Sequence, residues 1–237
     1  MSELNIAGFV PFSTVDWPGR LVAVVFLQGC PWRCPYCHNA EILDPRVKGP
    51  VGWNEVLNVL DSRVGLLDGV VFSGGEALMQ ASSGALANAL RQVRSRGFLT
   101  GLHAGGAYPR ALQTLLEDGL LDWVGLDIKA LPEDYPLATG RSGGLKAEES
   151  LRALVEHGEV AHEVRLTLWP GLAPSGDLVE YAGRVAAWAR DRGARTFALQ
   201  RYRYPAGDPQ ALPEVGWMDE EAQGLLEMLD FDTLIIR

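Results

Sequence analysis

Three closely spaced cysteines are the residues of this chain best suited to chemistry. Cys30, Cys34 and Cys37 are the only cysteines among 237 residues. An odd number packed this tightly is a poor disulfide framework, and in a reducing compartment such a group more often binds metal. A short loop can wrap three thiolates around one face of a [4Fe–4S] cluster, which is usually held by four cysteines. One iron would then take another ligand, so the spacing predicts a reactive centre rather than an electron carrier.

Zinc is the alternative metal for the same loop. Together with His38, the three cysteines would form a structural zinc site with three sulfur ligands and one nitrogen ligand. Adjacent Cys37 and His38 rarely both reach one tetrahedral ion without strain, which favours the cluster. Three unligated core cysteines fit less well, because proline and arginine lie between them and indicate a loop.

The elements that must position these cysteines follow a regular alternation. The cysteines come directly after an apolar run, and the rest of the chain repeats apolar runs followed by helical spacing. Such alternation predicts βαβ units and a parallel sheet, an α/β fold. Six units either close partly into a barrel or stay an open doubly wound sheet, and both place sites at the carboxyl ends of strands. The predicted strands cover residues 21–28, 68–73, 98–103, 121–129, 160–168, 196–202 and 233–236, and the predicted helices cover 53–60, 84–96, 108–118, 146–157, 178–192 and 219–229.

Composition narrows the function classes. The formal net charge of -9 argues against a duplex nucleic-acid binder, which usually shows a basic footprint. No apolar stretch reaches about 18 residues, so no transmembrane helix is expected. The first residues lack a cationic region followed by a long apolar one, so we expect no secretory signal and a cytoplasmic location.

The cysteine loop, residues 29–39, resembles that of the radical SAM superfamily. Members bind S-adenosylmethionine (SAM) through its amino and carboxylate groups at the fourth iron of one [4Fe–4S] cluster. The resemblance implies one-electron cleavage of SAM to a 5′-deoxyadenosyl radical, while the protein positions the reactants and excludes solvent. It also implies a partial (β/α)6 barrel with outer helices, as a single domain over residues 1–237 that ends in a helix and strand over 218–236.

The same resemblance assigns roles near the cluster. Tyr36, the aromatic residue before the third cysteine, would lie near the adenine of SAM. The turn after the second predicted strand matches the Gly-Gly-Glu-Pro motif, which contacts the amino group of SAM. Ala77 replaces the proline here, so the turn is less rigid. The residues of this turn are Ser73, Gly74, Gly75 and Glu76.

Charged residues at two later strand ends belong to the same expected site. Asp127 and Lys129 are two residues apart and so face the same side. In the activating-enzyme branch of the family an Asp-x-Lys at this place contacts SAM or its surroundings. The alternative is an ion pair that contributes little to stability. Arg165 is a candidate for binding the SAM carboxylate. The alternative is that it lies at an exposed strand end.

Three other segments are interpreted with less family support. Related enzymes carry Thr-Asn-Gly where this chain has His103, so a structural histidine with satisfied hydrogen bonds is the better interpretation. Residues 200–203 either face the substrate or form a charged rim. The stretch 134–144 is the most loop-like, and is either a mobile lid or a plain surface loop.

Residues 8–44 resemble a narrower group within the superfamily. They closely resemble the activating proteins of anaerobic (class III) ribonucleotide reductase and are similar to pyruvate formate-lyase activating enzymes. The resemblance then thins to short motifs at 73–76, 127–129 and 165–170. It implies removal of a hydrogen from a glycine Cα of a glycyl-radical enzyme partner, with a flavodoxin or ferredoxin as electron donor. The lack of further cysteines excludes auxiliary clusters.

Two other functions stay open at this point. One is a radical SAM enzyme for a small molecule, similar to a carboxydeazaguanine synthase, which would need a pocket with groups that read phosphate or purine. The other is a non-catalytic zinc or iron–sulfur module, which zinc without iron would indicate.

Overall fold

The computed structural model describes residues 3–173, 177–203, 224 and 229–237. These form one eight-stranded sheet whose strands follow chain order, β1-β2-β3-β4-β5-β6-β7-β8. All neighbouring pairs are parallel except β1 with β2, which is antiparallel. The strands are β1 (Ile6–Ser13), β2 (Val22–Leu27), β3 (Gly69–Gly74), β4 (Leu99–Ala104), β5 (Trp123–Asp127), β6 (Ala161–Leu168), β7 (Thr196–Arg201) and β8 (Thr233–Ile236).

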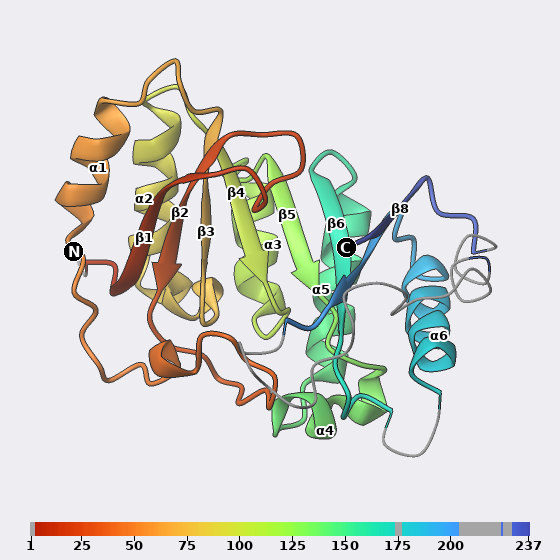
Figure 1. The fold of residues 1–237 in the computed structure, drawn as a ribbon. Helices are drawn as coiled ribbons and strands as arrows, with labels where there is room; N and C mark the ends of the chain where they lie inside the picture. The colour runs from red at the N-terminus through yellow and green to blue at the C-terminus, as the bar shows by residue number, and fades with distance from the viewer. Residues whose placement is uncertain (1–2, 174–176, 204–223, 225–228) are drawn as a thin grey trace.

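Helices return the chain between the parallel strands, as βαβ units require. Figure 1 shows α1, α2, α3 and α5 on one face of the sheet, whereas the short α4 lies beyond the carboxyl ends of the strands. The helices on this face bury apolar stripes; in α2, for example, the stripe contains Leu86, Leu90 and Val93. The helices are α1 (Trp53–Asp61), α2 (Ala85–Arg94), α3 (Pro109–Glu117), α4 (Tyr135–Thr139), α5 (Gly144–His157) and α6 (Leu178–Arg190).

A second, smaller core lies on the other face of the sheet. The connection between β1 and β2, red in Figure 1, crosses this face. Its Trp17 stacks on Trp123 of β5, with ring centroids 5.3 Å apart, and both pack with Val22, Val24 and Val71. The strand interiors are therefore covered on both faces, which explains why they read as continuous apolar runs.

The predicted α/β class is confirmed, and the strands and helices predicted from residue 21 to residue 202 occur with small shifts in their ends. Strand β1 was not predicted. It contains Gly8 and Pro11, which interrupt strand patterning and are tolerated at a sheet edge. The predicted helix over 219–229 falls largely outside the described residues.

The stretch 134–144 is more ordered than the prediction of a loop. Residues Tyr135–Thr139 form α4, which has a proline in its first turn and ends at Gly140 in the left-handed conformation. Pro136 suits the first turn of a helix because its missing N–H has no partner there. The remaining residues, 140–143, connect α4 to α5.

Candidate active site

A cavity of about 210 Å³ lies at the carboxyl ends of the central strands. It is lined by the three cysteines, by Tyr36, by the turn 73–76 after β3, and by charged residues after β5. Parallel strands end at one edge of their sheet, so residues distant in sequence meet there. The cavity is therefore a single site built from the loop after β2 and from the carboxyl ends of β3, β4, β5 and β6 with the residues that follow β3, β4 and β5. From the candidate set, these are Cys30, Cys34, Cys37, Tyr36, Ser73, Gly74, Gly75, Glu76, Asp127 and Lys129.

Backbone hydrogen bonds hold the cysteine loop in place. Cys30 N donates to Leu43 O at 3.0 Å, and Arg33 N donates to Thr139 O at 2.9 Å. The Arg33 guanidinium also donates to Cys30 O and Trp32 O, at 2.8 and 2.7 Å. Both the following chain and α4 therefore fix the path of the loop before any ligand binds.

The donor set of the cavity fits an iron–sulfur cluster. Thiolates are the soft ligands that select Fe–S clusters, copper(I) or zinc. Burial raises the pKa of the Cys30 thiol to about 12, partly offset by the Trp32 N–H that points at its sulfur. The thiol is therefore protonated in the metal-free protein and must lose its proton when it binds iron.

The zinc alternative finds little support in this geometry. His38 is directed away from the cysteines: its Nε2 lies 2.8 Å from Arg203 O, and its ring stacks on Tyr202. Among the described residues, no three His, Cys, Asp or Glu side chains gather closely enough to hold a single metal ion.

Aromatic rings form one wall of the site. Tyr36 is 7% exposed and stacks on Trp169, with centroids 5.0 Å apart. Tyr202 packs edge-on against the same ring at 6.4 Å. The Tyr36 hydroxyl and the Trp169 indole N–H are buried without a hydrogen-bond partner among the described residues. Two unsatisfied buried donors beside an aromatic surface suit a flat, polar ligand such as an adenine ring.

The turn after β3 depends on its two glycines. Gly74 has a φ of +123°, which a side chain would strain, and its Cβ would strike the backbone of Leu27. Gly75 approaches the cysteine loop so closely that a Cβ there would strike the Gly29 carbonyl. Gly75 N also donates to Leu27 O at 3.0 Å. The glycines therefore place the turn directly against the loop that carries the cysteines.

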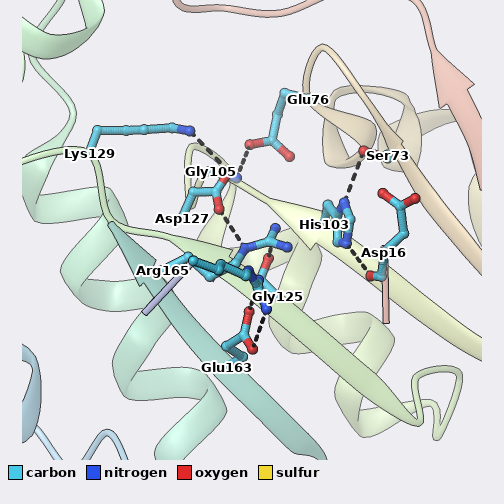
Figure 2. A network of polar contacts seen from close by, with 11 residues as sticks. Asp16, Ser73, Glu76, His103, Gly105, Gly125, Asp127, Lys129, Glu163 and Arg165 are labelled. Atoms are coloured by element: carbon cyan, nitrogen blue, oxygen red, sulfur yellow. Dashed lines mark hydrogen bonds and ion pairs between the residues drawn. The ribbon is translucent and has the colours of Figure 1, made fainter. Parts of the chain in front are cut away.

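The Glu76 carboxylate does not point freely into the cavity. The side chain is buried, and its two oxygens accept from Leu78 N at 3.3 Å and Gly105 N at 2.9 Å. Burial raises the pKa of Glu76 to about 7, against these hydrogen bonds, which lower it. The carboxylate thus ties the end of β3 to the end of β4 (Figure 2).

Asp127 lies between two cations, as Figure 2 shows. Its carboxylate accepts from Lys129 Nζ at 3.0 Å and from Arg165 Nε at 2.7 Å. Burial alone would raise the pKa of Asp127, but the charges of Arg165 and Lys129 outweigh it and hold the pKa below its usual range. The ion pair between Asp127 and Lys129, which was the alternative interpretation, is therefore present and includes Arg165. Contact between these residues and SAM stays a prediction.

Arg165 lies deeper than a residue at an exposed strand end. Its side chain is 7% exposed, and its NH2 group donates to Gly125 O at 3.1 Å. Gly125 makes room for it, because a Cβ there would lie 2.7 Å from the guanidinium carbon. Asp127 lines the cavity and Arg165 supports it from behind, so contact between Arg165 and the SAM carboxylate stays a prediction.

His103 has a hydrogen-bond partner on each ring nitrogen, as expected for a structural histidine. Nε2 lies 2.7 Å from Asp16 O, and Nδ1 lies 3.2 Å from Ser73 Oγ. A carbonyl only accepts, so Nε2 carries the proton and Nδ1 accepts from the hydroxyl. Burial, followed by the charge of Arg165, lowers the pKa of His103 to about 3, which keeps the ring neutral.

Sequence reasoning misses one residue beside the site and one contact outside it. Trp169, which follows the predicted strand 160–168, stacks on Tyr36. Arg237 pairs with the buried Glu163 at 2.6 Å, and an amide flip of Gln200 lets its oxygen accept from the same guanidinium. Gln200 therefore points toward Arg237 rather than acting as a simple charged rim. Neither contact has a local sequence signal, because the paired residues come from distant strands.

Comparison with known proteins identifies the family. The model of the radical SAM superfamily matches residues 24–180. The chain therefore belongs to the radical SAM superfamily, and the suspected resemblance is confirmed.

Three relatives of this chain are named as activating enzymes. The chain is 31% identical over 196 residues to the pyruvate formate-lyase 1-activating enzyme of Escherichia coli K12, covering 80% of this chain and 76% of the relative. It is 32% identical over 176 residues to the pyruvate formate-lyase-activating enzyme of Clostridium pasteurianum, covering 72% and 71%. A Methanocaldococcus jannaschii protein named for glycyl-radical enzyme activation is 28% identical over 184 residues, covering 76% and 75%.

Solved structures confirm the fold. The structure of native anSMEcpe with bound AdoMet aligns with a TM-score of 0.59 at 15% identity, over 89% of this chain and 61% of that protein. QueE from Escherichia coli aligns with a TM-score of 0.55 at 15% identity, over 99% of this chain and 94% of that one. At these identities the alignments establish the architecture alone. In the described residues, no helix is both long and apolar enough to cross a membrane.

Proposed function

We propose that this protein uses a [4Fe–4S] cluster and SAM to install a glycyl radical on a partner enzyme. The reaction would make it an oxidoreductase that activates another enzyme. The observation that carries the proposal is the single cavity that joins three thiols, the 73–76 turn and the Asp127–Lys129 pair. Bound together, the cluster and SAM would supply one-electron cleavage of a carbon–sulfur bond.

The residues of this chain have separate tasks in that reaction. Cys30, Cys34 and Cys37 would hold three irons and leave the fourth for SAM. The turn 73–76 would receive the ammonium group on its backbone carbonyls. Tyr36 would provide the flat surface for the adenine, and its unsatisfied hydroxyl a hydrogen bond. Lys129 and Asp127 line the same cavity, where Lys129 can face a carboxylate.

The proposed partner is a glycyl-radical enzyme, and anaerobic ribonucleotide reductase is the candidate. Relatives named as activating enzymes of pyruvate formate-lyase support the class of partner. The segment 8–44 favours the reductase, through its resemblance to activating proteins of that enzyme. A short match of 54% identity over 35 residues to the benzylsuccinate synthase activating enzyme of Thauera aromatica supports the same class of partner.

The first test separates cluster chemistry from partner choice. The protein is reconstituted anaerobically with iron and sulfide, reduced with dithionite and given SAM, and 5′-deoxyadenosine is measured by chromatography. Cys34→Ala should abolish both the cluster absorbance and product formation, because no other cysteine can replace the ligand. Ser62→Ala, an exposed change after α1, should keep the native rate. Native SAM cleavage by Cys34→Ala would overturn the site assignment.

The second test identifies the partner. Anaerobic ribonucleotide reductase and pyruvate formate-lyase are each added to the reduced enzyme with SAM, and the glycyl radical is measured by electron paramagnetic resonance. We expect the signal with the reductase. A signal with pyruvate formate-lyase alone would reassign the partner. SAM cleavage without a radical on either protein would favour the small-molecule alternative.

A further inference from the structure

A second cavity lies beside the cysteine loop, outside the site described above. Its volume is about 390 Å³, and it is lined by Pro31, Trp32, Tyr108, Arg141 and Lys146 together with small residues. Two of its lining residues, Pro31 and Trp32, lie between the first and second cysteines. The cavity therefore touches the loop expected to hold the cluster without opening on the residues expected to hold SAM.

Trp32 connects the two cavities. It lines both of them and is 5% exposed. Gly105 and Gly143 pack against its ring, since a Cβ at either position would approach it to 2.6 or 3.0 Å. Tyr135 of α4 meets it edge-on at 5.7 Å. A molecule in the outer cavity would thus be separated from the cysteine site by one fixed aromatic side chain.

The charge of this cavity opposes that of the chain. The formal net charge is -9, yet the described residues that line the outer cavity include two cations, Arg141 and Lys146, and no carboxylate. Neither cation makes an ion pair in the described part of the chain. Lys146 lies in the first turn of α5, where a carboxylate would suit the helix dipole better. Helix stability therefore gives no reason for this charge.

Two exposed apolar residues lie near the same cations in the sequence. Leu145, next to Lys146, is 73% exposed, and Leu137 of α4 is 43% exposed. Exposed apolar side chains beside unpaired charges of one sign are typical of surfaces that bind a partner transiently. Complementary charge mainly speeds association with such a partner and sets its specificity.

We propose that this basic cavity is the docking surface for the acidic redox protein that delivers one electron to the site. The inference rests on the proposed function, because only reductive cleavage of SAM requires an electron donor. With a flavodoxin as donor, the anionic flavin hydroquinone loses one electron and becomes the neutral semiquinone, the cluster gains that electron, and no proton is transferred. The glycine of the partner must instead reach the cavity on the other side of Trp32.

The test begins with binding. The affinity of an acidic flavodoxin for the cluster-loaded protein is measured by calorimetry at low ionic strength, under anaerobic conditions. The double variant Arg141→Glu/Lys146→Glu should raise the Kd about tenfold or more. The matched control Lys48→Glu/Arg63→Glu changes the net charge equally, at exposed residues on either side of α1, and should keep the Kd within about twofold. Equal weakening by both variants would overturn the proposal, because net charge alone would then explain binding.

Activity with two reductants completes the test. The double variant should form 5′-deoxyadenosine at the native rate with dithionite, and about tenfold more slowly with reduced flavodoxin at low ionic strength. A native rate with flavodoxin would overturn the docking surface and leave the proposed function intact. Loss of product with dithionite in the native protein would instead overturn the proposed function. If dithionite-driven activation of ribonucleotide reductase fell in the double variant, the surface would belong to the glycyl-radical partner, and the proposal would be wrong.

Discussion

Apart from the cysteines, Asp127 is the site residue whose replacement should lower stability and SAM binding most. Its single negative charge is shared by Arg165 and Lys129, whose side chains are 7% and 17% exposed. Asp127→Asn would leave two largely buried cations without their shared anion. Breaking a fully buried pair costs about 3–5 kcal/mol, and because Asp127 is 29% exposed we expect about 2 kcal/mol here. Urea unfolding measures this loss, and equilibrium dialysis should show weaker SAM binding.

A surface ion pair provides the control for this prediction. Asp118 pairs with Arg91 at 2.7 Å, with side chains 41% and 56% exposed. Asp118→Asn should change the free energy of unfolding by less than about 0.5 kcal/mol, since exposed pairs contribute little. Equal costs for Asp118→Asn and Asp127→Asn would show that burial does not strengthen the cavity pair.

Most residues of the candidate site are predictable from the sequence because the fold brings the ends of the strands together. Residues that end parallel strands meet at one sheet edge, so the order of the motifs along the chain is enough to group Glu76 and Asp127 with the cysteines. The orientation of side chains is not predictable in this way. Glu76 turns to Gly105, and Arg165 turns behind Asp127, because buried charges take the partners that the neighbouring strands offer.

At the scale of elements, His103 fixes the β1–β2 connection to β4. It is neutral in the folded protein, with a pKa of about 3, whereas an unfolded histidine titrates near 6.5. Between these values the unfolded state binds more protons, so the free energy of unfolding falls as the pH falls. The contribution of His103 is complete above pH ~6.5 and is lost progressively toward pH ~3, at up to about 1.4 kcal/mol per pH unit.

His103→Gln tests this pH dependence. The variant should be less stable than the native protein at neutral pH, because glutamine cannot reproduce both hydrogen bonds in the same geometry. The difference should shrink between pH 7 and pH 5, because only the native protein carries the histidine titration. Urea titrations at several pH values measure it. Parallel pH profiles for the two proteins would show that His103 does not titrate as described.

Elements with strong patterning were predicted, and those with weak patterning were not. Strands β2 to β7 are apolar runs covered on both faces, and this gives them a clear signal. Strand β1 exposes Val10 and Phe12 and contains a proline, so its pattern matches neither a buried strand nor a half-buried one. The helix α4 has only five residues, too few for a periodic pattern to emerge.

For the whole molecule, the contact between Arg237 and Glu163 ties the end of the described chain to the centre of the sheet. The Glu163 side chain is 2% exposed and Arg237 is 33% exposed. Arg237→Met should lower the free energy of unfolding by about 3 kcal/mol, because it leaves a buried carboxylate unpaired. Adding Glu163→Gln should restore most of that loss, as measured by urea unfolding. A double variant no more stable than Arg237→Met would show that charge is not the cause.

The strand order also determines when the site is completed during synthesis. Every strand pairs with its neighbour in the chain, so the sheet can grow from the N-terminus as the chain leaves the ribosome. The cysteine loop is made early, whereas Asp127, Lys129 and Thr167, which line the same cavity, come much later in the chain. The three thiols therefore emerge well before the segments that complete the cavity around them. A cell that makes this protein has a period in which iron can reach the thiols through solvent, and in which oxygen can reach them as well.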